Sequence, residues 1–208
     1  MGDFLWTPDA VRWMRDAAAK SGYYQRLAGR ILPYLPPQAR LLDAGCGTGE
    51  LARALAPHAA CVTAMDVSAP ALDALRDCPD NVRPLLADAF RHEPEEPYDA
   101  LLLCYFARPG EFLKLSRLSR GPVCLVCDRK RRDDYARRLE AADLSWREER
   151  FRLRFDQPLR TREEALRYAA HYALPPGSIR RSGDAEFGYA IRKTRDIALM
   201  CYEAGGGA

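Results

Sequence analysis

Histidine and long apolar runs are scarce in this 208-residue sequence. Its three histidines are well separated along the chain, which disfavours a zinc site. No uninterrupted apolar run approaches the roughly 20 residues that cross a bilayer. The first residues, MGDFLWTPDAVRW, also lack the charged-then-apolar layout of a signal peptide. These absences predict a cytoplasmic protein with neither a membrane span nor a metal.

The seven cysteines are an odd number and lie mostly inside apolar segments, which predicts reduced thiols. Cys124 and Cys127 form a C-x-x-C, but within the apolar run PVCLVCD, a predicted strand. Residues three apart on a strand point to opposite faces, so this pair is not expected to share a metal ion.

Positive charge is concentrated in the second half of the chain. Residues 1–104 hold 10 Lys+Arg and 14 Asp+Glu (−4), and residues 105–208 hold 22 and 15 (+7), which together give the net +3. Lysine stands only at positions 20, 114, 130 and 193, so the basic residues are mostly arginine. Two interpretations stay open: a compositional bias toward arginine, or a positive face for a phosphate, carboxylate or nucleic acid.

Short apolar segments alternate with helical segments between residues 38 and 143. ARLLDAG, CVTAMDVS, NVRPLLADAF, YDALLLCYF and GPVCLVCDR are predicted strands; GELARALAPH, APALDALRD, PGEFLKLSRL and RDDYARRLEAA are predicted helices. This alternation predicts an α/β fold with a parallel sheet covered by helices on both faces.

The two ends of the chain depart from this rhythm. Residues 8–35 predict two helices, and WREERFRLRF predicts an exposed antiparallel strand whose edge leaves monomer or homodimer open. A further helix is predicted over 161–174, with Thr161 as N-cap and Glu164 at the capping-box position. We expect one domain (1–208) with an N-terminal helical lid (1–37), a core (38–143) and C-terminal strands with the inserted helix (144–208).

Three glycines at alternate positions follow the first predicted strand, in LLDAGCGTGE. A strand, a glycine-rich turn and a helix N-terminus together make a ligand site at the carboxyl edge of a parallel sheet. The spacing of Gly45, Gly47 and Gly49 is G-x-G-x-G, which differs from the G-x-G-x-x-G of dinucleotide folds.

Three acids accompany the glycines. Asp43 precedes the first glycine by two residues, Asp66 ends the second strand and Asp88 ends the third. A carboxylate at the second position can accept hydrogen bonds from ribose hydroxyls, and one at the third from an exocyclic amine. Each acid could instead serve only as a helix cap or turn former.

The segments LLDAGCGTGELARALA, VTAMDVS, LLADAF and YDALLLCYF together resemble the successive motifs of class I S-adenosylmethionine-dependent methyltransferases, over roughly residues 38–128. The resemblance implies a doubly wound, mostly parallel seven-stranded sheet with an antiparallel C-terminal strand. It also implies that the core binds S-adenosylmethionine and releases S-adenosylhomocysteine, without a metal.

The resemblance implies roles for individual residues. Asp43 would lie near the amino group of the methionine moiety, Asp66 would hold the ribose, and Asp88 would face the adenine. The residues implied to bind the cofactor lie at the ends of the first four strands, apart from Tyr24 in the lid: Tyr24, Asp43, Gly45, Cys46, Gly47, Gly49, Asp66, Val67, Asp88, Ala89 and Cys104. Those implied for the substrate pocket are Tyr23, Tyr105, Phe106, His171 and Tyr172.

The sulfonium group already activates the methyl group, so in-line displacement mainly needs a positioned nucleophile, and a base only if that nucleophile is protonated. The catalytic residue therefore stays unknown, with Tyr23 and His171 as candidates. The fourth strand ends in CYFA, without an N/D-P-P-Y/F motif or a Pro-Cys pair, which disfavours methylation of nucleobase amines or of pyrimidine carbon 5.

A small-molecule acceptor is the favoured prediction, because the inserted segment 145–180 is short. RNA (tRNA or rRNA) is the alternative, since a basic run follows the fifth strand: Arg129, Lys130, Arg131, Arg132, Arg137 and Arg138. A non-catalytic methyltransferase-like subunit and an NAD-dependent enzyme are less favoured. The three acids argue against the first, and the glycine spacing argues against the second.

Overall fold

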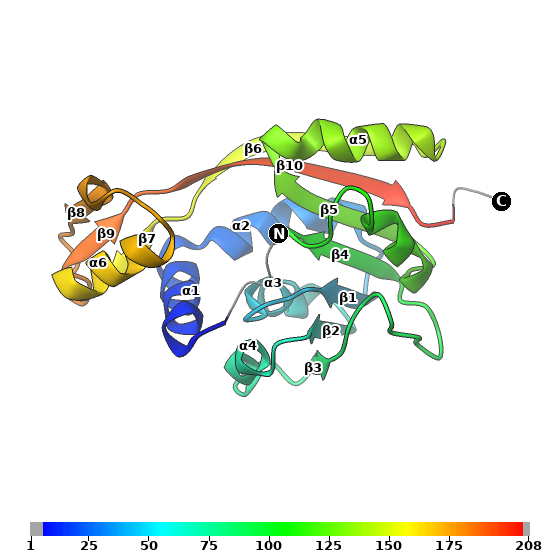
Figure 1. The fold of residues 1–208 in the computed structure, drawn as a ribbon. Helices are drawn as coiled ribbons and strands as arrows, with labels where there is room; N and C mark the ends of the chain where they lie inside the picture. Colours follow the sequence, from blue (N-terminus) through cyan, green and yellow to red (C-terminus); the bar gives the residue numbers. More distant parts are fainter. Residues whose placement is uncertain (1–5, 206–208) are drawn as a thin grey trace. The chain divides into compact units, whose positions relative to one another are not determined.

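The computed structural model describes residues 6–205 (Figure 1). Residues 1–5 and 206–208, which belong to the expected lid and C-terminal part, lie outside the described residues. The chain divides into two compact units: unit 1 is Met1–Tyr23 with Arg152–Arg195, and unit 2 is Tyr24–Phe151 with Asp196–Ala208. The expectation of a single domain stays a prediction.

A seven-stranded sheet is the main feature of unit 2, with the strand order β3-β2-β1-β4-β5-β10-β6. The first five strands are parallel, and β10 runs antiparallel to β5, with Cys201 opposite Cys124. The predicted mostly parallel sheet with an antiparallel C-terminal strand is therefore confirmed. The strands are β1 (Arg40–Ala44), β2 (Cys61–Asp66), β3 (Val82–Leu86), β4 (Ala100–Cys104), β5 (Pro122–Asp128), β6 (Trp146–Arg154) and β10 (Thr194–Glu203).

Helices pack on both faces of this sheet, as predicted. On one face, alternate residues such as Leu101 and Leu103 pack with Phe112 and Tyr135. On the other face, α3 and α4 lie against β2. The α-helices that belong to unit 2 are α2 (Tyr23–Ile31), which starts at the unit boundary, α3 (Glu50–Leu55), α4 (Ala69–Leu72) and α5 (Arg132–Ala141). Short 3₁₀ helices are η1 (Leu32–Tyr34), η2 (Ala56–His58), η3 (Asp73–Leu75), η4 (Phe112–Leu118) and η5 (Arg129–Arg131).

One predicted α-helix, PGEFLKLSRL, is instead the 3₁₀ helix η4. Its buried side chains are Phe112, Leu115 and Leu118, a spacing of three that aligns them on one side of a 3₁₀ helix. Glu111 at its start caps no backbone N–H with its side chain. The spacing of three between buried apolar residues therefore fits the three residues per turn of a 3₁₀ helix better than the 3.6 of an α-helix.

Unit 1 combines two helices with a small antiparallel sheet, β7-β9-β8. Helix α1 starts at Pro8, where Thr7 Oγ1 accepts a hydrogen bond from Ala10 N–H (3.2 Å), and ends at Gly22 with φ 58°. Trp13 of α1 is buried against residues of α6 and the sheet. The elements are α1 (Pro8–Ser21), β7 (Gln157–Leu159), α6 (Arg162–His171), η6 (Pro176–Ser178), β8 (Ile179–Arg181) and β9 (Tyr189–Ile191).

A buried carboxylate, Glu164, connects α1 to α6 inside unit 1. It accepts hydrogen bonds from Trp13 Nε1–H (3.0 Å) and from the backbone N–H of Arg160 (2.6 Å), and it pairs with Arg12. Thr161 caps α6 as predicted, but Glu164 reaches the N–H of Arg160 and not that of the cap residue. Burial opposes its ionisation, yet these donors outweigh burial and lower its pKa.

We expect Glu164→Gln to destabilise the protein by about 1–3 kcal/mol at pH 7, because a charge-assisted network loses its anion. Since the pKa of Glu164 is lowered in the folded protein, its contribution is present above the ordinary glutamate pKa and is lost as the pH falls through the folded value. Urea denaturation at pH 7 and at acidic pH measures this difference. The matched control is Glu163→Gln, whose side chain is 84% exposed; equal losses in the two variants would contradict the prediction.

Candidate functional site

The loop between β1 and α3 is tied to the end of β2 by backbone hydrogen bonds. The N–H groups of Gly45 and Cys46 both donate to the carbonyl of Met65, at 2.8 and 3.0 Å. The N–H of Gly47 donates to Oδ2 of Asp66 at 2.8 Å. The loop is therefore held at the carboxyl edge of the parallel sheet, where the sequence placed it.

All three glycines of the loop adopt left-handed backbone conformations, with φ of 70°, 55° and 72° for Gly45, Gly47 and Gly49. Other residues rarely adopt these angles. A Cβ at Gly45 would overlap the ring of Phe106, and one at Gly49 would overlap the side chain of Leu75. Glycine is therefore required at both positions by conformation and by space.

Asp43 is an acid buried beneath this loop, with 1% of its surface exposed. Neither of its carboxylate oxygens has a hydrogen-bond partner within the described residues. Burial, and secondly the nearby charge of Asp66, raise its pKa to about 7. The backbone N–H of Ala52, which lies near the carboxylate, lowers the pKa by a smaller amount. An unpaired buried carboxylate is costly, so this position favours a ligand that donates hydrogen bonds or carries positive charge.

Asp66 ends β2 and uses both carboxylate oxygens to organise the edge. Oδ2 accepts from Gly47 N–H, and Oδ1 accepts from Ser68 N–H at 2.9 Å. Each oxygen keeps lone-pair capacity for a further donor. The next residue, Val67, has 71% of its surface exposed, an apolar side chain presented to solvent beside the loop.

After β3, Asp88 and Ala89 occupy the neighbouring turn. Oδ1 of Asp88 accepts from Phe90 N–H at 2.9 Å, and Ala89 is buried. Phe90 is exposed, with its ring centroid 6.2 Å from that of Phe106. Asp88 therefore stabilises this turn, and its implied role facing the adenine stays a prediction.

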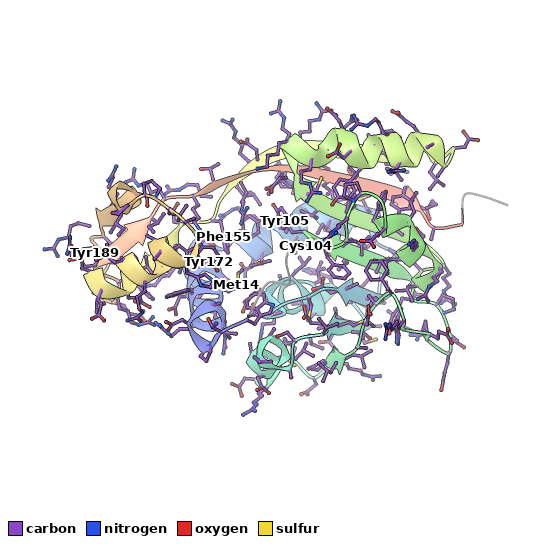
Figure 2. All side chains as sticks on the ribbon, in the orientation of Figure 1. Met14, Cys104, Tyr105, Phe155, Tyr172 and Tyr189 are labelled. Atoms are coloured by element: carbon purple, nitrogen blue, oxygen red, sulfur yellow. The ribbon has the colours of Figure 1, made fainter. Side chains whose placement is uncertain are left out.

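The segment after β4 has a strained backbone. Cys104 and Tyr105 lie at the carboxyl end of β4 (Figure 2). Tyr105 and Ala107 have φ of 54° and 63°, angles that cost non-glycine residues energy and that occur preferentially at functional sites. Hydrogen bonds fix the segment: Tyr105 N–H donates to the Val126 carbonyl (2.8 Å), and Tyr135 OH donates to the Ala107 carbonyl (2.9 Å).

Tyr24, from the first turn of α2, also reaches this edge. Burial raises the pKa of its hydroxyl well above the usual value, with further contributions from Cys104, Glu50, Asp43 and Tyr105. These contributions place Tyr24 near the glycine loop and the end of β4. Burial likewise raises the pKa of the Cys46 thiol far above its ordinary value, so this cysteine stays protonated.

The remaining predicted substrate residues belong to unit 1. Tyr23 is 2% exposed, and its ring centroid lies 4.7 Å from that of Phe155. His171 is exposed at the end of α6, 4.7 Å from the ring of Tyr172. Figure 2 labels Phe155 and Tyr172 among the side chains of this unit. Their roles stay predictions.

Two residues near this edge were missed from the sequence. Glu50, the first residue of α3, contributes to the raised Tyr24 pKa, and Phe90 extends the exposed apolar surface after β3. The signals were present: Glu50 directly follows the last glycine, and Phe90 ends LADAF. Within residues 6–205 no group of three or more His, Cys, Asp or Glu side chains is placed to hold a metal ion.

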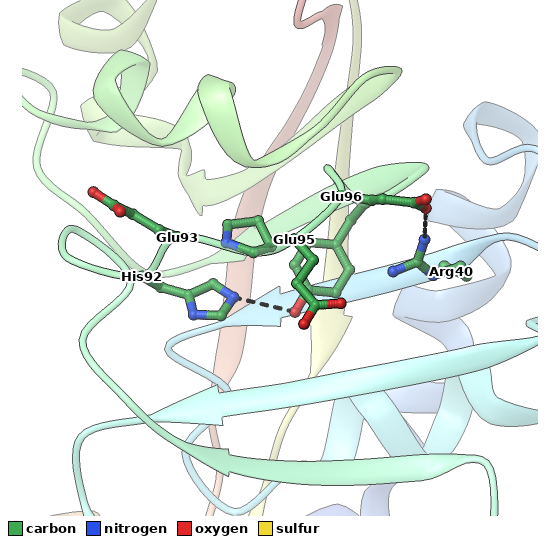
Figure 3. Close-up of a pocket in the computed structure, with 7 residues that line it drawn as sticks. Arg40, His92, Glu93, Glu95 and Glu96 are labelled. Carbon is green, nitrogen blue, oxygen red and sulfur yellow. Dashed lines mark hydrogen bonds and ion pairs between the residues drawn. The ribbon is translucent and has the colours of Figure 1, made fainter.

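A hollow lies at the opposite, amino edge of the sheet (Figure 3). Arg40 starts β1, and Tyr98 precedes β4; their partners in the hollow are Glu96 (3.0 Å from Arg40) and His92 (3.3 Å from the Tyr98 hydroxyl). Four residues of extended strand, about 13 Å, separate Arg40 from Ala44 at the glycine loop. This hollow is therefore distinct from the glycine-loop edge.

Comparison with known proteins agrees with the interpretation of the glycine loop and its acids as a ligand site. Residues 41–114 match a family model described as a methyltransferase domain. No sequence among curated proteins matches the chain. No helix among the described residues has the length and apolar character to span a membrane.

Several solved structures share the fold. A functionally unknown protein from Deinococcus radiodurans R1 is 18% identical (TM-score 0.60), with 92% of this chain and 96% of that chain covered. A putative methyltransferase from Bacillus halodurans C-125 is 18% identical (TM-score 0.55; 86% and 98% covered). Magnesium protoporphyrin IX methyltransferase from Synechocystis PCC 6803, solved with bound SAM, is 16% identical (TM-score 0.54; 97% and 86% covered).

At these identities the likeness to solved structures is one of fold. The methyltransferase-domain match runs from within β1 to the first residues of η4, and it includes the glycine loop and the three acids. Residues 41–114 are therefore similar to a methyltransferase domain, and the seven-stranded sheet shares the fold of solved methyltransferase structures.

Proposed function

We propose that this enzyme transfers a methyl group from S-adenosylmethionine to a small-molecule acceptor, with the cofactor at the glycine-loop edge of unit 2. The observation that carries the proposal is the buried Asp43 carboxylate, which lacks a hydrogen-bond partner beneath three left-handed glycines. A cofactor with an ammonium group and a ribose suits a site where Asp43 and Asp66 offer carboxylate acceptors and the glycine loop lets a ligand approach the backbone closely.

S-adenosylmethionine supplies a methyl group that its positive sulfur already activates. The residues of this chain bind the cofactor and orient it. In the proposal Asp43 accepts from the amino group, and Asp66 accepts from the ribose hydroxyls with the lone pairs left free by Gly47 and Ser68. The exposed side chains of Val67 and Phe90 offer apolar surface to the adenine.

Tyr24 and Cys104 complete the proposed cofactor site. Because burial raises the pKa of Tyr24 well above its usual value, the phenol stays neutral near pH 7 and can donate a hydrogen bond, but it does not act as an anion. The strained Tyr105 and the neighbouring Phe106 follow β4, and we assign them to the acceptor side of the site. The catalytic residue stays open between Tyr23 and His171.

A small acceptor is preferred over RNA because the basic run after β5 is partly neutralised. Arg132 pairs with Glu148 (2.6 Å) and Asp133 (3.0 Å), and Arg137 pairs with Asp134 (2.5 Å). An RNA-binding surface would be expected to present these cations to phosphates. RNA binding that weakens steeply with salt would favour the alternative.

Asp66→Ala is expected to weaken S-adenosylhomocysteine binding at least tenfold, about 1.4 kcal/mol. The substitution removes the proposed ribose acceptor and the anchor of the Gly47 N–H. Isothermal titration calorimetry of the purified protein measures it, with NAD as control ligand and the exposed Asp80→Ala as control variant. Failure of the unmodified protein to bind S-adenosylhomocysteine would refute the proposed function.

Gly45→Ala should abolish detectable S-adenosylhomocysteine binding, because alanine strains the left-handed backbone and its Cβ overlaps Phe106. Gly29→Ala is the matched control, because nothing lies within 4 Å of its added Cβ in helix α2. That variant should bind normally and gain about 0.5–1 kcal/mol of stability. Calorimetry and thermal melts check both, and normal binding by Gly45→Ala would count against the loop as the cofactor site.

Asp43→Asn should stabilise the ligand-free protein at pH 8 while weakening cofactor binding. Because the pKa of Asp43 is raised to about 7 in the folded protein, its ionisation costs stability as the pH rises from the unfolded pKa through about 7. A shift of about three pKa units sets an upper limit of about 4 kcal/mol, reduced by the unpaired amide of asparagine. Melting temperatures at pH 5 and pH 8 measure the effect; a pH-independent difference would contradict it.

A further inference from the structure

Lys193 is a half-buried cation directly before β10, in unit 1. Its backbone is fixed, because its N–H donates to Asp156 Oδ1 (3.0 Å) and its carbonyl accepts from Phe155 N–H (2.9 Å). Its Nζ donates to the hydroxyl of Tyr168 and lies 4.6 and 5.0 Å from the ring centroids of Tyr168 and Tyr172. Across residues 6–205, no carboxylate forms an ion pair with it.

This environment leaves the ammonium short of acceptors. An ammonium has three donors; Tyr168 takes one, and ring faces satisfy donors only weakly. Burial, and secondly the positive charge of Arg195, lower the pKa of Lys193 to about 8. A desolvated cation beside a second cation creates a positive potential that favours an anion.

Aromatic side chains surround this positive point. The ring centroids of Tyr168 and Tyr172 lie 4.6 Å apart, and that of Trp13 lies 5.0 Å from Tyr168. Tyr172 and Tyr189, both labelled in Figure 2, are only half-buried against this cluster, so apolar ring surface remains accessible. A flat apolar body could pack here while an acidic group meets the ammonium.

The charge of unit 1 agrees with an anionic ligand. Unit 1 holds 13 Lys+Arg and 8 Asp+Glu, a net +5, whereas unit 2 holds 19 and 21, a net −2. The positive charge of the whole chain therefore belongs to unit 1. Long-range attraction of an acidic small molecule to this unit follows from that distribution.

We propose that Lys193, with the rings of Tyr168 and Tyr172, binds the carboxylate of an aromatic acid. The half-buried position of Nζ selects a small ligand over a nucleic-acid backbone. The site is defined by residues of unit 1 alone.

The test is calorimetric titration of the full-length protein with benzoate, and with benzamide as an uncharged analogue of similar shape. We expect benzoate to bind with a dissociation constant of about 1 mM or lower, and benzamide at least tenfold more weakly. Lys193→Met keeps the apolar stem and removes the charge, so it should weaken benzoate binding at least tenfold. Lys114→Met, at an exposed lysine in unit 2, should bind benzoate normally.

A second measurement needs no substitution. Benzoate binding by the unmodified protein should weaken as the pH rises from 7 to 9.5, because Lys193 loses its proton. The titratable and charged groups around it are Tyr168, Tyr172, Arg195 and Asp156, and His171 contacts the ring of Tyr172. Burial raises the pKa of both tyrosines, which keeps them neutral over this range.

Absence of benzoate binding, equal binding of benzamide, or binding unchanged in a folded Lys193→Met would overturn the proposal. Binding of a single-stranded RNA that depends on Lys193, without benzoate binding, would also overturn it. S-adenosylhomocysteine titrated into the same preparations separates the two proposals. Normal cofactor binding without benzoate binding removes only the Lys193 site, and the reverse removes only the methyl-transfer proposal.

Discussion

The two hydrogen bonds accepted by the Asp66 carboxylate hold the functional edge of unit 2 together. One comes from Gly47 in the loop after β1, and the other from Ser68, the N-cap of α4. A single side chain at the end of β2 thus fixes the loop and the start of the next helix. Glycines lose much conformational entropy on folding, so a loop with three of them needs such an anchor to keep one shape.

Several arrangements close to the Asp66 carboxylate are energetically unfavourable. Asp43 is buried without hydrogen-bond partners, and Tyr105 and Ala107 hold left-handed angles at the neighbouring strand end. Each arrangement costs free energy in the ligand-free protein and is supported by a well-packed sheet. The concentration of these costs at the carboxyl ends of β1 and β4 distinguishes this edge from the amino edge, where Arg40 and Tyr98 have ordinary partners.

The features that could be predicted from the sequence, the sheet and its glycine loop, are encoded by local patterns. The glycine spacing, the strand-end acids and the apolar runs each lie within a few residues, and they predicted the sheet and its loop. Tyr24 was placed near the cofactor only by resemblance, since its approach to Asp43 and Cys104 depends on how α2 packs. The tyrosine rings around Lys193 depend on tertiary contacts between segments far apart in the sequence, which no local pattern encodes. The 3₁₀ form of η4 was missed although its buried apolar residues recur every three positions.

The strand order β5-β10-β6 also has a consequence for how the chain reaches its native state. Among the described strands of that sheet, β6 is paired with β10 alone, and β10 follows it in the sequence by about 40 residues. A nascent chain can pair β1 to β5 early, but β6 stays unpaired along its backbone until β10 has been synthesised and inserts beside it. The charged residues that alternate along β6 disfavour aggregation of this unpaired strand with other chains during synthesis.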